Sequence, residues 1–384
     1  MPRPADPERR RSDRLLEEMA AEIDRRGGWI PFSRYMELAL YHPRLGYYAS
    51  GTVGFGAGGD FVTAPELGPV YAASLARCCL PLLTETGGDL LEIGAGSGAL
   101  AAALLPELER LGAAPRRYLI VDRSRALRER QQQRLREALP PGLYARVSWL
   151  EGPPEAPFDG VILANEVLDA LPVERFEITP EGPRLLGVTL TGGALAWRSA
   201  GGPDPRLEAA WSRLGLELPV GYRSEIALDL PRWLEQQTRA LRRGAALFID
   251  YGYPRTEYYH PQRREGTLIC HYRQRGFDQP LALPGLIDLS AFVDFTALAE
   301  AADACGLEVS GFASQAHFLI DCGLEEVTAG LMELPDRERA LRLAELHRLT
   351  HPGEMGERFK VMALSRNLAG AVPGFDRFDR RHAL

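Results

Sequence analysis

The sequence has few cysteines, and none of them form a C-x-x-C pair. Five are scattered through 384 residues: Cys78, Cys79, Cys270, Cys305 and Cys322. An odd, scattered set argues against both a disulfide framework and a structural zinc site. The free thiols indicate reducing surroundings, and we predict a cytoplasmic protein.

Basic excess, long apolar runs and clustered histidines are also missing. The net charge of −7 argues against a broad basic surface, so we expect no nucleic-acid partner. No apolar stretch is long and uncharged enough to span a bilayer, and we expect no membrane insertion. The seven histidines are spread out and no serine lies in G-x-S-x-G, so we expect neither a metal site nor a serine nucleophile.

Short apolar runs alternate with helical patterns through the middle of the chain, which is typical of a parallel sheet. Strands are predicted at Leu90 to Ile93, Tyr118 to Val121, Val147 to Leu150, Gly160 to Ala164, and in the run ending at Asp250. From Glu174 to about Ala200 the pattern changes to that of antiparallel hairpins, which we interpret as an insertion. Residues 307–312 and 317–321 are predicted to form a closing antiparallel pair, and the remainder to be helical.

The stretch LLEIGAGSGALAAALL predicts a strand, a glycine turn and a helix, which together form a nucleotide-type cradle. Its glycines also satisfy the dinucleotide pattern, with Ala99 in the last place, so they fit both NAD and S-adenosylmethionine. Glu92, just before the turn, suits the ammonium of methionine and would repel a diphosphate. The cradle therefore favours S-adenosylmethionine, contacted by Glu92, Gly94, Ala95 and Gly96.

The next strand ends carry further candidates, because ligands of open α/β sheets lie beyond the carboxyl ends of the strands. Asp122 ends the second strand and is suited to hydrogen-bond both ribose hydroxyls. Trp149 and Leu150 end the third and could flank the adenine, although a tryptophan there is as often part of the core.

The fourth strand ends in Asn165 and Glu166, and Asp169 follows three residues after Glu166. This spacing is one helical turn and lets both carboxylates face one pocket. They could serve acid–base chemistry, bind a metal or grip a guanidinium. An equal alternative is that they are simply the acidic first turn of a helix.

Several segments together resemble the MidA-like family of S-adenosylmethionine-dependent methyltransferases. They run in family order from about Gly59 to Leu319, and are GDFVTAPELGPVYA, LLEIGAGSGAL, GVILANEVLDALPVERFE, ALFIDYGYP, GTLICHYRQR, PGLIDLSAFVDFTALAEAA and QAHFL. The chain departs from the family pattern at Phe292 and near Arg275, where members often have histidine.

The resemblance implies a class I methyltransferase, an α/β Rossmann-like fold with a seven-stranded, mostly parallel sheet and an antiparallel closing strand. A helical N-terminal part and the hairpin insertion would be added to it. The expected organisation is a flexible tail (1–14), a helical head with a cofactor-covering loop (15–88), the methyltransferase domain (89–325, insertion at about 174–225) and a helical extension (326–384).

The resemblance also implies function. The mitochondrial homologue is a complex I assembly factor that methylates an arginine, which implies a protein arginine acceptor here, with a respiratory complex I subunit as a candidate. By carry-over, Glu92, Gly94, Gly96 and Asp122 would bind the cofactor, with Asn165 beside them. Thr63 and Pro65 would lie on the covering loop, and Glu166 and Asp169 would face the acceptor. Two alternatives stay open, an NAD(P)-dependent oxidoreductase and a non-catalytic, cofactor-binding assembly factor.

Overall fold

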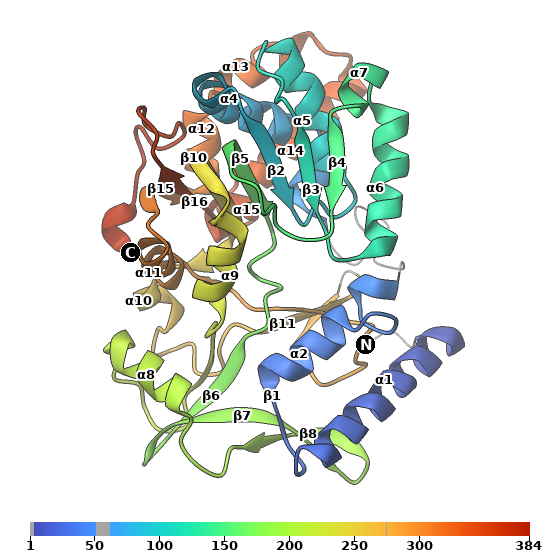
Figure 1. Cartoon of the computed structure of the whole chain (residues 1–384), viewed down its shortest axis with the longest axis vertical. Helices are drawn as coiled ribbons and strands as arrows, with labels where there is room; N and C mark the ends of the chain where they lie inside the picture. The colour runs from blue at the N-terminus through green and yellow to red at the C-terminus, as the bar shows by residue number, and fades with distance from the viewer. Residues whose placement is uncertain (1–3, 51–61, 274) are drawn as a thin grey trace.

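The computed structural model describes residues 4–50, 62–273 and 275–384. Its upper half in Figure 1 is a layer of strands between two layers of helices, and its lower half holds two smaller sheets and the N-terminal helices. The glycine-dense part of the expected covering loop, residues 51–61, lies outside the described residues.

The central sheet has the spatial order β15-β16-β10-β5-β2-β3-β4, and β14 pairs with β10. Its strands are β2 (Asp89–Ile93), β3 (Tyr118–Val121), β4 (Val147–Leu150), β5 (Phe158–Asn165), β10 (Leu241–Tyr253), β14 (Val293–Asp294), β15 (Glu308–Ser314) and β16 (Phe359–Arg366). The five strands from β4 to β10 are parallel, so the carboxyl ends of β2, β3 and β5 meet at one edge. The α/β class is as expected.

The strand count differs from the expected seven, since the described residues give this sheet eight strands. The additional strand, β14, pairs with the last two residues of β10, a strand that continues beyond the expected end at Asp250. Gly252 permits this pairing, because a Cβ at this position would lie 2.2 Å from the backbone oxygen of Val293.

Of the two segments predicted to form a closing antiparallel pair, the first is a strand but the prediction for the second is wrong. Residues 317–321 lie in helix α12 (Gln315–Asp321), and the partner of β15 is β16, which runs antiparallel to both β15 and β10. The expected helical extension therefore contains an interior strand of the sheet, β16, beside the edge strand β15. Seven of the eight residues of β16 are buried, and its short apolar run at residues 361–364 does not distinguish a buried strand from a buried helix by periodicity.

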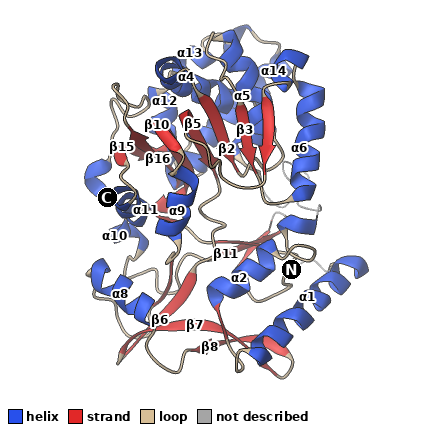
Figure 2. Ribbon diagram, viewed as in Figure 1, coloured by secondary structure: helices blue, strands red, loops and turns tan. Residues whose placement is uncertain are grey.

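Successive side chains along the strands of the central sheet point to opposite faces, so each face carries its own cluster of buried apolar residues. Leu90 and Leu247 point to one face, which is covered by α4 (Pro69–Thr86), α5 (Ala99–Arg110) and the C-terminal helices. Leu91 and Phe248 point to the other face, against α9 (Leu230–Thr238) and α11 (Phe295–Ala304). Figure 2 shows these helices on both sides of the strands.

The N-terminal head and the hairpin insertion pack into one unit below the sheet (Figure 1). Strand β1 of the head pairs antiparallel with β7 of the insertion, with Ile30 opposite Val188. The strands of this unit are β1 (Ile30–Pro31), β6 (Glu174–Thr179), β7 (Gly182–Thr191), β8 (Ala194–Ser199) and β9 (Arg223–Ile226), with β11 (Ile269–Tyr272), β12 (Arg275–Phe277) and β13 (Asp288–Ser290) in a third sheet. The expected hairpins are therefore present.

The expected flexible tail up to residue 14 is largely helical. Helix α1 (Asp6–Arg25) begins with Asp6 and Glu8 in its first turn, where acidic residues favour the positive end of the helix dipole. Its buried face carries Leu15, Met19 and Ile23, which pack against α2 (Phe32–Tyr41) and the insertion.

The other helices complete the two halves. They are α3 (Ala64–Leu67), α6 (Arg125–Ala138), α7 (Pro141–Tyr144), α8 (Pro205–Leu214), α10 (Arg255–Tyr258), α13 (Leu324–Thr328), α14 (Asp336–Thr350), α15 (Met355–Arg358) and the short 3₁₀ turns η1 (Tyr48–Ser50), η2 (Leu331–Glu333) and η3 (Arg381–Ala383). Within the described ranges, no helix combines the length and the apolar character that crossing a bilayer requires.

Candidate functional site

The glycine turn joins β2 to α5 and is built from left-handed backbone. Gly94, Gly96 and Gly98 have φ of 67°, 53° and 81°, values that favour glycine. A Cβ on Gly94 would also lie 3.0 Å from a methyl carbon of Val167, on the turn after β5. The glycines therefore bring the backbone close to the neighbouring strand end, as the sequence predicts for a cradle.

Glu92 lies in the wall of a cavity beside this turn, although its side chain is largely buried. Its Oε2 accepts a hydrogen bond of 2.7 Å from the hydroxyl of Tyr118 on β3. Burial raises the pKa of Glu92 to about 7, against the opposing effect of the Tyr118 hydrogen bond. A cation bound beside this carboxylate would favour its charged form.

Asp122 directly follows β3 and is held by two donors. Its carboxylate accepts from the backbone N–H of Ser124 and from Nε2 of Gln131, both at 2.9 Å. The same Gln131 nitrogen also donates to the backbone oxygen of Gly96 at 2.9 Å. Burial raises the pKa of Asp122. The buried Gln131 amide thus connects Asp122, the residue predicted to bind the ribose, to the glycine turn. The polar sequence of α6 gave no sign of this role.

Trp149 and Leu150 do not line the cavity in the described part of the chain. The indole nitrogen of Trp149 instead donates to Oε1 of Gln131 at 3.0 Å. Trp149 therefore lies behind the cavity wall and orients the amide that holds Asp122.

The segment after the undescribed loop closes one side of the cavity. Thr63, Pro65 and Glu66 line it, and Glu66 accepts a hydrogen bond from Ser97 in the glycine turn. Arg134 of α6 donates to Glu66 at 3.0 Å and to Ser97 at 2.6 Å. These contacts tie the covering segment to the cradle.

Residues 166–173, all described, form turns instead of the helix start considered from the sequence. Glu166 has φ of 54°, in the left-handed region that is uncommon for residues other than glycine. Asp250 explains why the turn is stable, because its Oδ2 accepts from the backbone N–H groups of Val167, Leu168 and Asp169 at 2.9–3.2 Å. This carboxylate binds the amides that would otherwise begin a helix.

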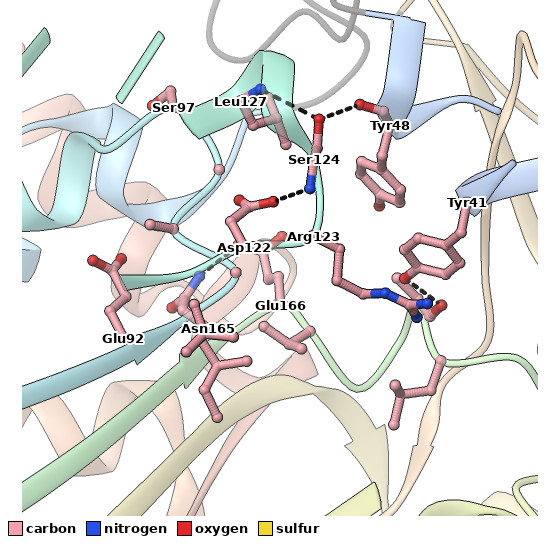
Figure 3. Close-up of a pocket in the computed structure, with 18 of the residues that line it drawn as sticks. Tyr41, Tyr48, Glu92, Ser97, Asp122, Arg123, Ser124, Leu127, Asn165 and Glu166 are labelled. Carbon is pink, nitrogen blue, oxygen red and sulfur yellow. Dashed lines mark hydrogen bonds between the residues drawn. The ribbon is translucent and has the colours of Figure 1, made fainter. Parts of the chain in front are cut away.

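Glu166 is half-buried, and its carboxyl group lies at the cavity wall. It accepts a 3.1 Å hydrogen bond from Nδ2 of Asn165, and the backbone N–H of Ala64 also donates to it. Burial, and then the nearby charge of Asp169, raise the pKa of Glu166 to about 8. Figure 3 shows Asn165 and Glu166 below Asp122, across the cavity from Tyr48.

Asp169 does not line the cavity in the described structure, contrary to the prediction that both acids face one pocket. It lies on the same turn, where its Oδ2 accepts from the hydroxyl of Tyr251 and its buried Oδ1 has no hydrogen-bond partner among the described residues. Burial raises the pKa of Asp169 to about 6. The charge of Asp169 therefore raises the pKa of Glu166, although Asp169 itself does not line the cavity.

The N-terminal head supplies the opposite wall, which sequence reasoning missed. The hydroxyl of Ser124 donates to the backbone oxygen of Tyr48 at 2.7 Å, and Tyr48 stacks on Tyr41 with ring centroids 5.4 Å apart. The Arg123 guanidinium lies 5.4 Å from the centre of the Tyr41 ring (Figure 3). No local sequence signal links these tyrosines to a site, because their position depends on packing between distant segments.

The cavity has a volume of about 730 Å³, within the range of small-molecule sites. Of the predicted site residues, those that line it are Thr63, Pro65, Glu92, Gly94, Ala95, Gly96, Asp122, Asn165 and Glu166. Among the described residues, no cluster of three or more histidine, cysteine or acidic side chains could hold a metal ion. The cavity therefore offers carboxylates, backbone groups and aromatic rings to a ligand.

The sequence model of a family of S-adenosyl-L-methionine-dependent methyltransferases matches residues 74–313. The chain belongs to this MidA-like methyltransferase family. The matched residues extend from α4 to β15 and include the glycine turn, Asp122 and Glu166. S-adenosylmethionine is therefore the methyl donor, and nothing in the comparisons supports the oxidoreductase alternative.

A crystal structure from Burkholderia thailandensis, solved with S-adenosyl-homocysteine bound, is 42% identical to this methyltransferase, covers 100% of both chains and has a TM-score of 0.94. Among curated proteins, the mitochondrial protein arginine methyltransferase NDUFAF7 homolog of Drosophila melanogaster is 28% identical, over 91% of this chain and 84% of that protein. The mitochondrial protein arginine methyltransferase NDUFAF7 of Homo sapiens is 27% identical, over 88% and 80%.

The mitochondrial names contradict the cytoplasmic location expected from the cysteines. All five cysteines are free, as expected, but free thiols indicate reducing surroundings without identifying the compartment. The inference from cysteine usage to the cytoplasm was therefore wrong.

Proposed function

We propose that this methyltransferase transfers the methyl group to the guanidinium of an arginine in a protein partner. The names of the Drosophila and human relatives support an arginine acceptor. The observation that carries the proposal is Glu166, a half-buried carboxyl group held at the cavity wall by a left-handed turn. A subunit of respiratory complex I is the partner that we propose from the family resemblance.

The residues present fit S-adenosylmethionine. Glu92 would bind the ammonium of its methionine part, and Asp122 the ribose hydroxyls. The left-handed glycine turn leaves room for the ligand to approach the backbone, since side chains there would be strained. When bound, the cofactor supplies a methyl group activated by a positively charged sulfur. Thr63 and Pro65 would cover it.

Glu166 would hold the acceptor. A guanidinium is planar and positively charged, and a carboxylate binds it with charge-assisted hydrogen bonds of fixed geometry. The acidic surroundings favour a cation, because the guanidinium would relieve the repulsion between Glu166 and Asp169. We therefore assign Glu166 the catalytic role and Asp169 a supporting charge.

Glu166 would also receive the proton. The acceptor nitrogen forms a bond to the methyl carbon as the carbon–sulfur bond breaks, and this nitrogen must lose one proton for the product to keep a single positive charge. A carboxylate with a raised pKa is a better proton acceptor than an exposed one. Positioning and charge would supply most of the rate enhancement.

The test combines binding with product analysis. We expect calorimetry to show S-adenosylhomocysteine binding that is greatly weakened in Glu92→Ala and Asp122→Ala. Tritiated S-adenosylmethionine, incubated with the enzyme and a lysate of cells lacking the gene, should label protein, and mass spectrometry should find the methyl group on arginine. Labelling confined to lysine or to small molecules would contradict the arginine acceptor.

Complementation of a deletion strain separates catalysis from the alternative of a non-catalytic assembly factor. If an Asp122→Ala protein is folded, does not bind the cofactor and still restores full function to a deletion strain, methyl transfer is not the biological role. We expect no restoration, because the proposed function requires the cofactor.

A further inference from the structure

Tyr71 lies on α4 and connects to the proposed acceptor carboxylate through one amide. Its hydroxyl donates a hydrogen bond to Oδ1 of Asn165, whose Nδ2 donates to Oε1 of Glu166 at 3.1 Å. The Tyr71 side chain is only 1% exposed. Burial, and then the charge of Glu166, raise the pKa of Tyr71 well above its ordinary value, so the phenol keeps its proton and remains a donor.

Helix α14 of the C-terminal region holds the turn of α4 that carries Tyr71. The buried carboxylate of Glu345 accepts from the backbone N–H groups of Val70 at 2.7 Å and Tyr71 at 3.4 Å. Arg342 pairs with Glu345 at 2.8 Å. These bonds satisfy backbone donors in the first turn of α4 and fix where the Tyr71 ring enters the core.

We propose that Tyr71 is a positioning residue for Glu166, acting through the Asn165 amide and anchored by Glu345. This inference rests on the acceptor role proposed above for Glu166. An amide side chain presents either a donor or an acceptor to its neighbour, depending on its rotation. Because the Tyr71 hydroxyl donates to Oδ1 of Asn165, the amide presents its Nδ2 to Glu166.

Removing the Tyr71 hydroxyl would leave the amide free to present Oδ1 to Glu166, which disfavours the ionised carboxylate. The other groups around Glu166 would not change. Asp169 on its own turn, Asp250 on β10 and Asp288 on β13 disfavour its charge, and the Ala64 N–H on α3 favours it. Tyr71→Phe should therefore raise the pKa of Glu166 by about one unit, the effect of one hydrogen bond to a charged group.

The first measurement needs neither cofactor nor acceptor. A carboxyl group with a raised pKa contributes stability that is complete below its unfolded pKa and is lost as the pH rises through the folded pKa. We would measure unfolding by urea from pH 5 to pH 9. The loss should end around pH 8 in wild type and should extend about one pH unit higher in Tyr71→Phe.

Four variants make this measurement specific. In a Glu166→Gln background, Tyr71→Phe should lower stability equally at every pH. Asn165→Ala should shift the pH profile as Tyr71→Phe does, and combining the two should add no further shift. Tyr35→Phe is the matched control, since it removes another buried hydroxyl, one that donates to the backbone of Pro280, and should not shift the profile.

A pH-independent loss in Tyr71→Phe, equal to that in Tyr35→Phe, would overturn the inference. So would additive shifts from Tyr71→Phe and Asn165→Ala. The second measurement is turnover, for which we expect Tyr71→Phe to lower kcat about tenfold at pH 7 with S-adenosylhomocysteine affinity within about twofold of wild type. If Glu166→Gln methylates arginine as fast as wild type, the proposed role of Glu166 fails, while the stability profiles still report whether Tyr71 acts on it.

Discussion

Gln131 and Asp122 are joined by a hydrogen bond of 2.9 Å, and the same Gln131 nitrogen reaches the backbone of Gly96. Two parts of the proposed cofactor site from different strand ends are therefore fixed by one amide. The second oxygen of Asp122 accepts from the backbone of Ser124, so the carboxylate has little freedom to rotate. This arrangement places an acid at the end of β3 in a single orientation before any ligand arrives.

Replacing Gln131 with methionine should weaken cofactor binding. Methionine keeps the length of the side chain but removes the bonds to Asp122 and Gly96 and the acceptor of the Trp149 indole, so Asp122 and the glycine turn lose their connection. We expect the Kd for S-adenosylhomocysteine to rise about tenfold by calorimetry. The control is Gln133→Met on the exposed side of the same helix, which should leave the Kd unchanged.

Glu166→Gln should preserve cofactor affinity and lower arginine methylation at least about a hundredfold, the scale expected when one charged interaction with the transition state is removed. The amide retains the shape but neither attracts the guanidinium nor receives its proton. Initial rates with tritiated cofactor measure the effect. Equal rates for variant and wild type would remove Glu166 from the mechanism.

S-adenosylhomocysteine binding should release protons near pH 7. Burial raises the pKa of Glu92 to about 7, and an ammonium bound beside it would lower this value, so part of the population must lose a proton on binding. Affinity should therefore rise as the pH increases from about 6 to 8. Calorimetry in buffers of different ionisation enthalpy measures the release. Glu92→Gln should abolish it, and persistence of the release in that variant would assign the proton to another group.

Asp250→Ala should destabilise the turn that carries Glu166. Three backbone N–H groups would lose their acceptor, and we expect a loss of about 3 kcal/mol in urea unfolding together with at least tenfold slower methylation. Asp204→Ala is the comparison, because Asp204 also accepts from backbone N–H groups, at the start of α8 far along the chain. It should lower stability without slowing methylation.

Gly94→Ala should prevent cofactor binding at concentrations that saturate wild type. The φ of 67° is unfavourable for alanine, and the added Cβ would lie 3.0 Å from a methyl carbon of Val167, so the turn is strained and Val167 must shift. Gly112→Ala is the control, since it also has a positive φ but no atom within 4 Å of the added Cβ. Comparable stability loss in both variants, with binding lost only in Gly94→Ala, is the expected result.

The sequence identified the cradle and the acids at the strand ends because both depend on local signals. Glycines followed by helix formers indicate a strand-to-helix turn, and apolar runs ending in Glu92, Asp122 and Asn165 place these residues at one edge of a parallel sheet. That edge lies where the pattern predicted, and the cavity adjoins it.

Tertiary packing decided the rest. A helix after Asn165 was a reasonable expectation, but Asp250, 85 residues along the chain, takes the backbone donors and holds a left-handed turn at Glu166. The segment expected to be a strand forms helix α12, and part of the segment expected to be helical forms strand β16. A buried strand and a buried helix have similar apolar composition, and β16 is a strand because it pairs with β10 and β15.

The sequence by itself thus determined the fold class, the family and the acids available to a cofactor, since short-range patterns encode strand ends and turns. Only the tertiary structure decided that Tyr41 and Tyr48 form a wall, that Gln131 fixes Asp122 and that Tyr71 reaches Glu166 through Asn165. These contacts join segments that are far apart in the chain, and a buried polar side chain takes whichever partner the packing places beside it.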